Sequence, residues 1–238
     1  MSETGARALR LALVGMGKMG RAVAALASER DFTVVATLGR PAQAGAITPA
    51  ALAGADVAIE FSEPASAADN AMACVAAGCP VVVGTTGWYD RLPEVTAEVA
   101  RRGGAVVWAP NFSIGVNLFL RLVADAARTM IGARFDVHVV ETHHAAKKDA
   151  PSGTAQALAR VLSDGLGRGV PVTSVRIGHV PGSHDVVFDA PFEQIRLEHA
   201  ARDRRVFAEG ALVAARWVVG RQGVFTMADV VSPGEGRR

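Results

Sequence analysis

The chain has 238 residues, 50% of them hydrophobic, a formal net charge of +2 and two cysteines without metal-site or disulfide spacing. This length can bury one large or two modest domains, and a near-neutral chain without a basic run is a poor candidate for binding nucleic acid. Because no apolar run could span a bilayer and residues 2–8 lack the apolar core of a signal peptide, we expect a cytoplasmic protein with neither membrane nor metal partners.

A glycine-rich turn follows the first predicted strand. Residues 11–14 are an apolar run typical of a buried parallel strand, and residues 21–28 have helical spacing. Between them lies the G-x-G-x-x-G pattern Gly15, Met16, Gly17, Lys18, Met19, Gly20. Its glycines permit a tight turn, approach of a pyrophosphate to the backbone, and close packing of helix on strand. With a second apolar strand at residues 33–38, the pattern predicts a dinucleotide site.

The end of that second strand indicates which dinucleotide is bound. A carboxylate is expected there when the ribose 2′-hydroxyl of NAD is recognised. The chain has Gly39 and Arg40 instead, and a guanidinium is a strong donor to a 2′-phosphate. We therefore expect NADPH to be preferred, with NADH possible and Lys18 adding positive charge. The alternative, that Arg40 is an ordinary solvated loop residue, stays open.

Strands and helices then alternate along the chain. Predicted strands at residues 57–61, 80–83 and 105–108 are separated by predicted helices at residues 65–77 and 92–102. This order predicts a doubly wound parallel sheet, with ligands at the carboxyl ends of its strands. Turns with small and polar residues follow two of these strands, and we favour a cofactor site over ordinary turn chemistry there. The residues assigned to the cofactor are Gly84, Thr85, Thr86, Ala109, Pro110, Asn111 and Phe112.

After residue 113 the rhythm changes. A long helix at residues 116–130 and a strand at residues 135–140 lead to β-like segments without helices between them, at residues 172–179, 185–188 and 194–199. These predict a mixed or antiparallel sheet, and a helix at residues 210–219 returns before the final segment 225–231. We therefore expect a doubly wound parallel-sheet domain and a second domain with its own mixed or antiparallel sheet, with the final helix packing back on the first domain.

Residues 141–155 carry most of the chemistry. They read E-T-H-H-A-A-K-K-D-A-P-S-G-T-A, which places two imidazoles, two lysines and two carboxylates just after the strand predicted to end at residue 140. Ser152 can cap a helix that starts near Thr154, and a helix N-terminus is a site for an anionic group. We expect a strand-end loop of proton-transfer groups followed by a carboxylate or phosphate cradle. The other four histidines, His138, His179, His184 and His199, are isolated and expected to be structural.

Lysine usage singles out the same segment. Of the 25 basic residues only Lys18, Lys147 and Lys148 are lysine. An ammonium can give up a proton, whereas a guanidinium cannot. Lysine retained among arginines is therefore consistent with proton transfer, although chance survival is the alternative.

These residues together resemble a known family, the dihydrodipicolinate reductases (4-hydroxy-tetrahydrodipicolinate reductases) of bacterial lysine and diaminopimelate biosynthesis. The resemblance runs through nearly the whole chain, and the segment 141–155 is its most specific part. The other matching stretches are residues 15–20, 60–62, 84–87, 109–113, 115–117, His199, Arg204, and residues 207–208, 210–211 and 214–217.

The resemblance implies a Rossmann-like dinucleotide-binding domain, residues 1–113 plus 206–238, around an inserted α+β domain, residues 114–205, for substrate binding and oligomerisation. It implies hydride transfer from NADPH or NADH to a cyclic imine dicarboxylate derived from 4-hydroxy-tetrahydrodipicolinate, by a homotetramer built through the sheets of its substrate domains. It implies that His143 is the proton donor and acceptor and Lys147 a proton donor. His144 would bind substrate, and a substrate carboxylate would lie against Ser152, Gly153 and Thr154. This agrees with the residues, because a ring that has accepted hydride must be protonated by an acid of near-neutral pKa.

Three other functions share part of this pattern. A related two-domain amino-acid or imine dehydrogenase would have the glycine loop but should lack the H-H-x-x-K and S-G-T pattern. A non-catalytic dinucleotide sensor would bind NADPH without turnover. A metal hydrolase could use His143 and His144, but neighbouring strand residues point in opposite directions and no third ligand is suitably spaced.

Overall fold

The computed structural model of the protein describes residues 7–39 and 47–232. The chain divides into two compact units, residues 1–113 with 205–238 and residues 114–204. The strands of the first unit are β1 (Leu9–Val14), β2 (Phe32–Leu38), β3 (Val57–Glu60), β4 (Val81–Val83), β5 (Ala105–Trp108) and β10 (Gly223–Thr226). Its helices are α1 (Lys18–Ala27), α2 (Pro64–Ala76), α3 (Leu92–Arg102), α6 (Arg205–Val218) and α7 (Met227–Val230), with short 3₁₀ turns at Ser28–Arg30 and Tyr89–Arg91.

The first unit is a doubly wound parallel sheet, as predicted. Its strand order is β10-β5-β4-β3-β1-β2, and every neighbouring pair is parallel. The order reverses between β1 and β3, which is where such sheets bind their ligands. The sixth strand, β10, comes from the C-terminal segment, which completes this unit after the chain has formed the second one.

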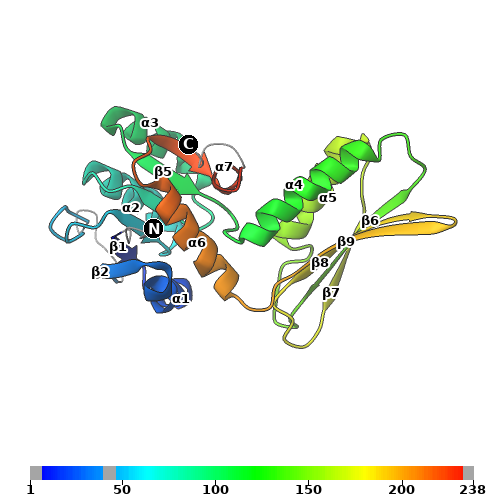
Figure 1. Ribbon diagram of the computed structural model, residues 1–238, viewed down its shortest axis with the longest axis horizontal. Coiled ribbons are helices and arrows are strands. Elements are labelled where there is room, and N and C mark those ends of the chain that lie inside the picture. Colours follow the sequence, from blue (N-terminus) through cyan, green and yellow to red (C-terminus); the bar gives the residue numbers. More distant parts are fainter. Residues whose placement is uncertain (1–6, 40–46, 233–238) are drawn as a thin grey trace, which may run out of the picture. The chain divides into compact units, whose positions relative to one another are not determined.

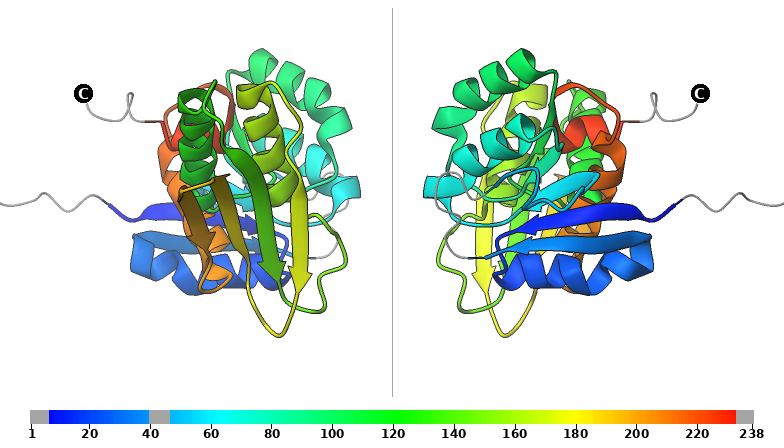
Figure 2. Two further views of the ribbon diagram at one scale, coloured as in Figure 1. Left: turned by 90° about the vertical axis from the view of Figure 1, so that its right-hand side faces the viewer. Right: turned by 90° about the vertical axis from the view of Figure 1, so that its left-hand side faces the viewer.

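Helices cover both faces of this sheet because its strands are apolar on both sides. Alternate strand residues such as Ala12, Val14 and Val83 pack against α2 and α3 in one buried cluster. The opposite face carries α1 and α6, which lie against each other and, for α6, against β3, β4 and β5. Figures 1 and 2 show α1 beside the β1–β2 pair.

The second unit is a four-stranded mixed sheet with two helices. It contains α4 (Ile114–Thr129), β6 (Asp136–His143), α5 (Gly153–Leu166), β7 (Val172–Arg176), β8 (Ser183–Ala190) and β9 (Glu193–Ala200), in the strand order β7-β6-β8-β9. Strand β7 is parallel to β6, and the other two pairs are antiparallel. Helices α4 and α5 lie together on one face of the sheet (Figure 1), where Phe119, Leu158 and Phe188 belong to one buried cluster.

Strand β6 and helix α6 are among the elements whose bounds differ from the sequence expectation. Strand β6 continues to His143 rather than ending at residue 140, because β7 and β8 pair with it on both sides as far as Thr142. Glu141 and His143 therefore lie on a strand, not on a loop. Helix α6 begins at Arg205 rather than at residue 210, and Gly210 is buried within it.

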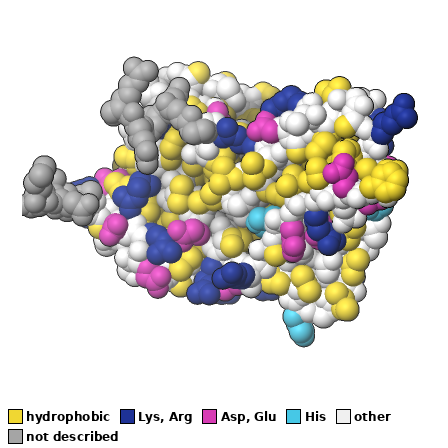
Figure 3. Space-filling model, turned by 45° about the vertical axis from the view of Figure 1, so that its right-hand side comes forward, with side chains coloured by type: hydrophobic (Ala, Val, Ile, Leu, Met, Phe, Trp, Pro, Cys, Tyr) yellow, Lys and Arg dark blue, Asp and Glu magenta, His cyan; other side chains and the backbone are white. Residues whose placement is uncertain are grey.

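The surface of the described residues is mixed in charge. On the face drawn in Figure 3, acidic and basic side chains lie next to one another, in keeping with the small net charge. Among the described residues no helix is both long enough and apolar enough to cross a membrane.

Candidate active site

The last residues of β6 hold a buried acid–imidazole pair. Glu141 and His143 are two positions apart on the strand, so their side chains point to the same face. The Glu141 side chain is fully buried and that of His143 is 11% exposed. The Nδ1 atom of His143 makes a short contact with Oε2 of Glu141.

The second oxygen of Glu141 binds two further groups. Its Oε1 atom accepts a hydrogen bond from the Arg176 guanidinium at 2.7 Å and one from the backbone N–H of Ser152 at 3.2 Å. Burial alone would raise the pKa of this carboxyl, but the hydrogen bonds, that from Arg176 above all, outweigh burial and lower the pKa to about 2. Glu141 is therefore ionised at neutral pH, and a buried carboxylate with these partners is fully compensated.

The pKa of His143 is lowered, chiefly by burial, while the carboxylate of Glu141 acts in the opposite direction and raises it. Burial thus favours the neutral form of the His143 ring, and the Glu141 carboxylate favours its charged form.

Helix α5 begins beside this pair. Ser152 is its N-cap, as predicted, and the Ser152 hydroxyl accepts the N–H of Ala155 at 3.2 Å. The first turn contains no acidic side chain, and a Cβ added at Gly153 would meet no atom within 4 Å. The helix N-terminus at Gly153 and the partly exposed Thr154 is thus open to an anionic group.

Lys147 lies in the loop between β6 and α5. Its ammonium binds both carboxylate oxygens of Asp149, at 2.8 and 2.9 Å. This hydrogen bond is the main cause of a lowered pKa at Asp149. Lys147 is 22% exposed, whereas the neighbouring Lys148 is exposed. Of the two lysines, Lys147 is the one that the loop holds in place.

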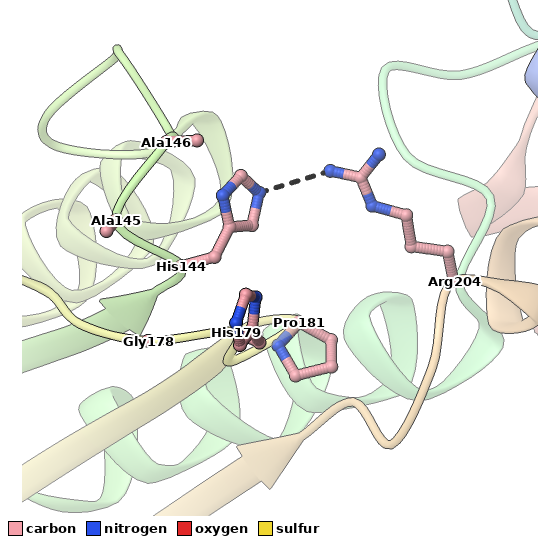
Figure 4. A pocket seen from close by; sticks show the side chains of 7 residues that line it. All are labelled: His144, Ala145, Ala146, Gly178, His179, Pro181 and Arg204. Carbon is pink, nitrogen blue, oxygen red and sulfur yellow. Dashed lines mark hydrogen bonds between the residues drawn. The ribbon is translucent and has the colours of Figure 1, made fainter.

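A cavity of about 480 Å³ opens next to His144 (Figure 4). The Arg204 side chain points into it, and a guanidinium nitrogen of Arg204 lies 3.2 Å from Nε2 of His144. The role of Arg204 could not be read from the sequence, and the structure places it against a predicted substrate-binding residue. The other lining residues are Ala145, Ala146, Gly178, His179 and Pro181.

His184 is not isolated, contrary to the sequence expectation. It is buried on β8, its ring centroid lies 5.3 Å from that of His143, and its Nε2 atom lies 3.3 Å from the Ser152 hydroxyl. His199 follows on β9, with its ring 6.3 Å from that of His184. The antiparallel pairing of β6, β8 and β9 brings these rings together, and sequence spacing carries no sign of it.

The predicted dinucleotide residues lie at the carboxyl ends of β1, β4 and β5 in the first unit. Helix α1 starts just after Gly17, and a Cβ added to Gly17 would meet nothing within 4 Å. A Cβ at Gly20 would lie 2.0 Å from the Gly15 carbonyl oxygen, so this glycine permits the close packing that the pattern predicts. The open N-terminus of α1 fits a pyrophosphate. Of the other residues in the turn, Lys18 is exposed, and Met16 and Met19 are partly exposed.

Phe61 joins these strand ends, which sequence reasoning did not anticipate. A Cβ at Gly15 would lie 2.2 Å from the Phe61 carbonyl oxygen, and one at Gly84 would lie 2.0 Å from the Phe61 ring. The same ring makes an edge contact with Phe112 after β5, at 6.3 Å between centroids. In the sequence, the sign of this contact is that an aromatic residue, Phe61, directly follows the strand β3.

The remaining predicted residues are in ordered turns. Thr85 is buried and its carbonyl accepts the indole N–H of Trp88 at 2.8 Å. The side-chain oxygen of Asn111, which follows Ala109 and Pro110, accepts the N–H of Ser113 at 2.8 Å and closes a turn over residues 111–113. Thr86 is exposed. Arg40 lies outside the described residues. Within residues 7–39 and 47–232, no group of three or more His, Cys, Asp or Glu side chains could hold a metal ion.

Comparisons with known proteins find relatives over nearly the whole chain. The family models described as dihydrodipicolinate reductase, N-terminus, and dihydrodipicolinate reductase, C-terminus, match residues 9–112 and 115–231. The 4-hydroxy-tetrahydrodipicolinate reductase of Myxococcus xanthus is 43% identical over 223 residues, covering 84% of this chain and 78% of the relative. That of Christiangramia forsetii is 34% identical over 237 residues, covering 94% of this chain and 98% of the relative.

Solved structures share the fold. A dipicolinate-bound dihydrodipicolinate reductase from Paenisporosarcina sp. TG-14 is similar with a TM-score of 0.78 and 22% identity, covering 92% of this chain and 97% of that one. An amine dehydrogenase from Mycobacterium smegmatis is also similar, with a TM-score of 0.60 and 10% identity over 97% of each chain. Because this architecture serves more than one reductase chemistry, the fold alone does not identify the substrate.

Proposed function

The chain belongs to the dihydrodipicolinate reductase family, a family of oxidoreductases, and from this premise we propose that it reduces 4-hydroxy-tetrahydrodipicolinate, by way of dihydrodipicolinate, to tetrahydrodipicolinate in lysine and diaminopimelate biosynthesis. The observation that carries the proposal is the buried Glu141–His143 pair, whose carboxylate also binds the N-terminal end of helix α5. One carboxylate thus connects a proton-transfer group to an anion-binding helix terminus.

The predicted site residues then each have a part in one reaction. His143 supplies the proton that the reduced ring requires, and Lys147 is a second donor. One substrate carboxylate lies against Ser152, Gly153 and Thr154, where a helix terminus favours negative charge. His144 and the Arg204 guanidinium beside it carry donors for the other carboxylate.

A nicotinamide dinucleotide would be held by the strand ends of the first unit and would supply the hydride when bound. The open N-terminus of α1 at Gly17 supports pyrophosphate binding there. The turns at Gly84, Thr85 and Thr86 and at Ala109, Pro110, Asn111 and Phe112 are proposed to hold the rest of the cofactor. Gly15, Met16, Lys18, Met19 and Gly20 complete the first of these strand ends.

NADPH is proposed as the preferred cofactor because Gly39 stands where an acid would bind the ribose of NAD, and the next residue, Arg40, can donate to a 2′-phosphate. The dissociation constants of NADPH and NADH for the wild type and for Arg40→Ala test this. We expect the variant to lose affinity for NADPH selectively. Equal constants for the two cofactors in the wild type would contradict the preference.

Assembly and location are proposed from the resemblance. Within the second unit, α4 and α5 lie on one face of the β7-β6-β8-β9 sheet, and no described helix of that unit covers the other face, which supports a homotetramer formed through these sheets. A molar mass measured by light scattering tests the assembly. A cytoplasmic location is proposed for a biosynthetic enzyme of this family.

The test of the activity is NADPH oxidation in the presence of freshly generated dihydrodipicolinate synthase product. We expect substrate-dependent oxidation, with His143→Ala lowering kcat by roughly 100-fold or more and His144→Ala mainly raising KM. NADPH binding without turnover would favour a dinucleotide sensor instead. Turnover of an acyclic or monocarboxylate imine at a comparable rate would favour an amino-acid or imine dehydrogenase.

A further inference from the structure

We propose that Glu141 and Arg176 are positioning residues, which orient the imidazole of His143 so that its Nε2 atom alone exchanges the proton with substrate. The proposal rests on the proposed function and adds to it the identity of the transferring atom and the groups that select it. It begins from the two contacts made by the Glu141 carboxylate.

The contacts fix Glu141 from both sides. Its Oε2 atom contacts Nδ1 of His143, and its Oε1 atom accepts from Arg176 at 2.7 Å and from the Ser152 N–H at 3.2 Å. Strand register enforces this arrangement, because β7 places Arg176 directly beside His143 on β6. Arg176 is itself held by the Asp149 carbonyl oxygen, at 2.5 Å.

The ionised Glu141 determines the tautomer. An ionised carboxylate is an acceptor only, so Nδ1 of His143 must carry a hydrogen to satisfy the contact. The neutral ring then has its lone pair on Nε2, and the charged ring carries its exchangeable proton there. Arg176 keeps Glu141 ionised, and the carboxylate in turn stabilises the imidazolium that donates the proton.

The chain passes close to Nε2 at Gly182, the residue before β8, where a side chain is absent. A Cβ added to Gly182 would lie 3.0 Å from Nε2 of His143. The charged or titratable groups around the ring are Glu141 on its own strand, Arg176 on β7, His184 on β8 and Lys147 in the following loop. Of these, only Glu141 carries negative charge, so its removal has a predictable sign.

The first experiment compares Glu141→Gln with Asp136→Asn. Both changes neutralise an acid on β6, and Asp136 has its own arginine partner, Arg168, at 3.8 Å, but lies away from His143. When the carboxylate is lost, the imidazolium is less stable, so the limb over which kcat falls with rising pH should move to lower pH by about 1 unit or more. At neutral pH kcat should fall roughly 100-fold, with the NADPH dissociation constant unchanged. Asp136→Asn should keep the wild-type profile.

A second measurement needs neither turnover nor a change at Glu141. Nitrogen-15 spectra of the histidine rings in the wild-type protein report which nitrogen carries the hydrogen, and His143→Gln identifies the His143 signal by its loss. We expect the Nδ1–H tautomer for the neutral ring. An Nε2–H tautomer would overturn the proposal, even if Glu141→Gln did not fold.

The two failures can be told apart. If the wild type did not oxidise NADPH with the stated substrate, the proposed function would fail while the tautomer measurement still tested the positioning. If the wild type were active and Glu141→Gln kept the wild-type pH profile, Glu141 would be a structural residue and the positioning proposal would be wrong.

Discussion

The hydroxyl of Ser152 lies 3.3 Å from Nε2 of His184, although the two residues are 32 positions apart in the sequence. The same hydroxyl caps helix α5 by accepting the Ala155 N–H, while the Ser152 backbone N–H donates to Glu141. The N-terminal end of α5 is thus tied to strand β6 through Glu141 and to strand β8 through His184. This double attachment sets the proposed carboxylate cradle in register with His143.

His184 should make stability depend on pH. Burial, with a smaller contribution from nearby His143, lowers its pKa to about 4. The unfolded chain has a histidine pKa of about 6.5, so acid protonates the unfolded state first, and stability falls as the pH drops from about 6.5 to about 4. The loss attributable to this one ring is on the order of 3 kcal/mol. His184→Gln should unfold with a flatter pH dependence in chemical denaturation.

The matched control for this prediction is the exposed His179, changed to Gln. It should keep the wild-type slope of unfolding free energy against pH. Equal slopes for wild type and His184→Gln would mean that other groups dominate the acid sensitivity.

Local sequence chemistry predicted the beginning of α5 but not its surroundings. The order Pro151, Ser152, Gly153 predicts an N-cap, because capping depends on residues adjacent in the chain. The contact with His184 depends on how β8 pairs with β6, which no local pattern encodes. The tertiary contacts therefore had to come from the structure.

At the end of β6 the local sequence pattern gave a wrong prediction. A run of polar residues favours a loop, and the strand was expected to stop before Glu141. Strand pairing on both sides and the internal Glu141–His143 contact compensate the buried polar groups, so the strand continues to His143. Polar residues at two-residue spacing in a buried strand were the available signal.

The glycine loop should separate cofactor binding from folding. Gly17→Ala adds a methyl group where no atom lies within 4 Å, at a φ of −70° that alanine adopts readily. It should keep the Tm and weaken NADPH binding by about tenfold, equivalent to ~1.4 kcal/mol, because the methyl group occupies the approach of the pyrophosphate. Fluorescence titration with NADPH measures the effect.

Gly20→Ala provides the comparison within the same turn. Its methyl group would lie 2.0 Å from the Gly15 carbonyl oxygen, so helix α1 must move away from the strand end. We expect a lower Tm or no soluble protein. A Gly17→Ala protein with wild-type NADPH affinity would show that the pyrophosphate does not approach at this residue.

The two adjacent lysines should differ in function. Lys147→Arg keeps a cation beside Asp149 but removes a group that can release its proton, so it should retain NADPH binding and part of the substrate affinity while losing most turnover. Lys148→Arg, at an exposed position, should stay near wild type. Steady-state kcat and KM for both variants give the comparison. An active Lys147→Arg enzyme would reduce this lysine to an electrostatic clamp, and an inactive Lys148→Arg enzyme would mean that the wrong lysine was assigned.

Gly182 should be required for turnover because of the space it leaves beside His143. In Gly182→Ala the added methyl carbon would lie 3.0 Å from Nε2, the atom proposed to exchange the proton, and 3.3 Å from Cδ2 of the same ring. Either the ring turns away from Glu141 or the substrate loses its approach, and both lower kcat more than they raise KM. We expect at least a tenfold loss of kcat, corresponding to about 1.4 kcal/mol in the barrier.

Backbone strain must be separated from this effect, because Gly182 has a φ of +153° that alanine rarely adopts. Gly132→Ala is the control: it also places alanine at a positive φ, +78°, in the same unit, and its methyl group would meet no atom within 4 Å. Both variants should lose Tm, and kcat is therefore compared per folded enzyme well below either transition. If strain alone mattered, kcat would be retained in both. If Nε2 is the reacting atom, Gly182→Ala loses turnover while Gly132→Ala does not.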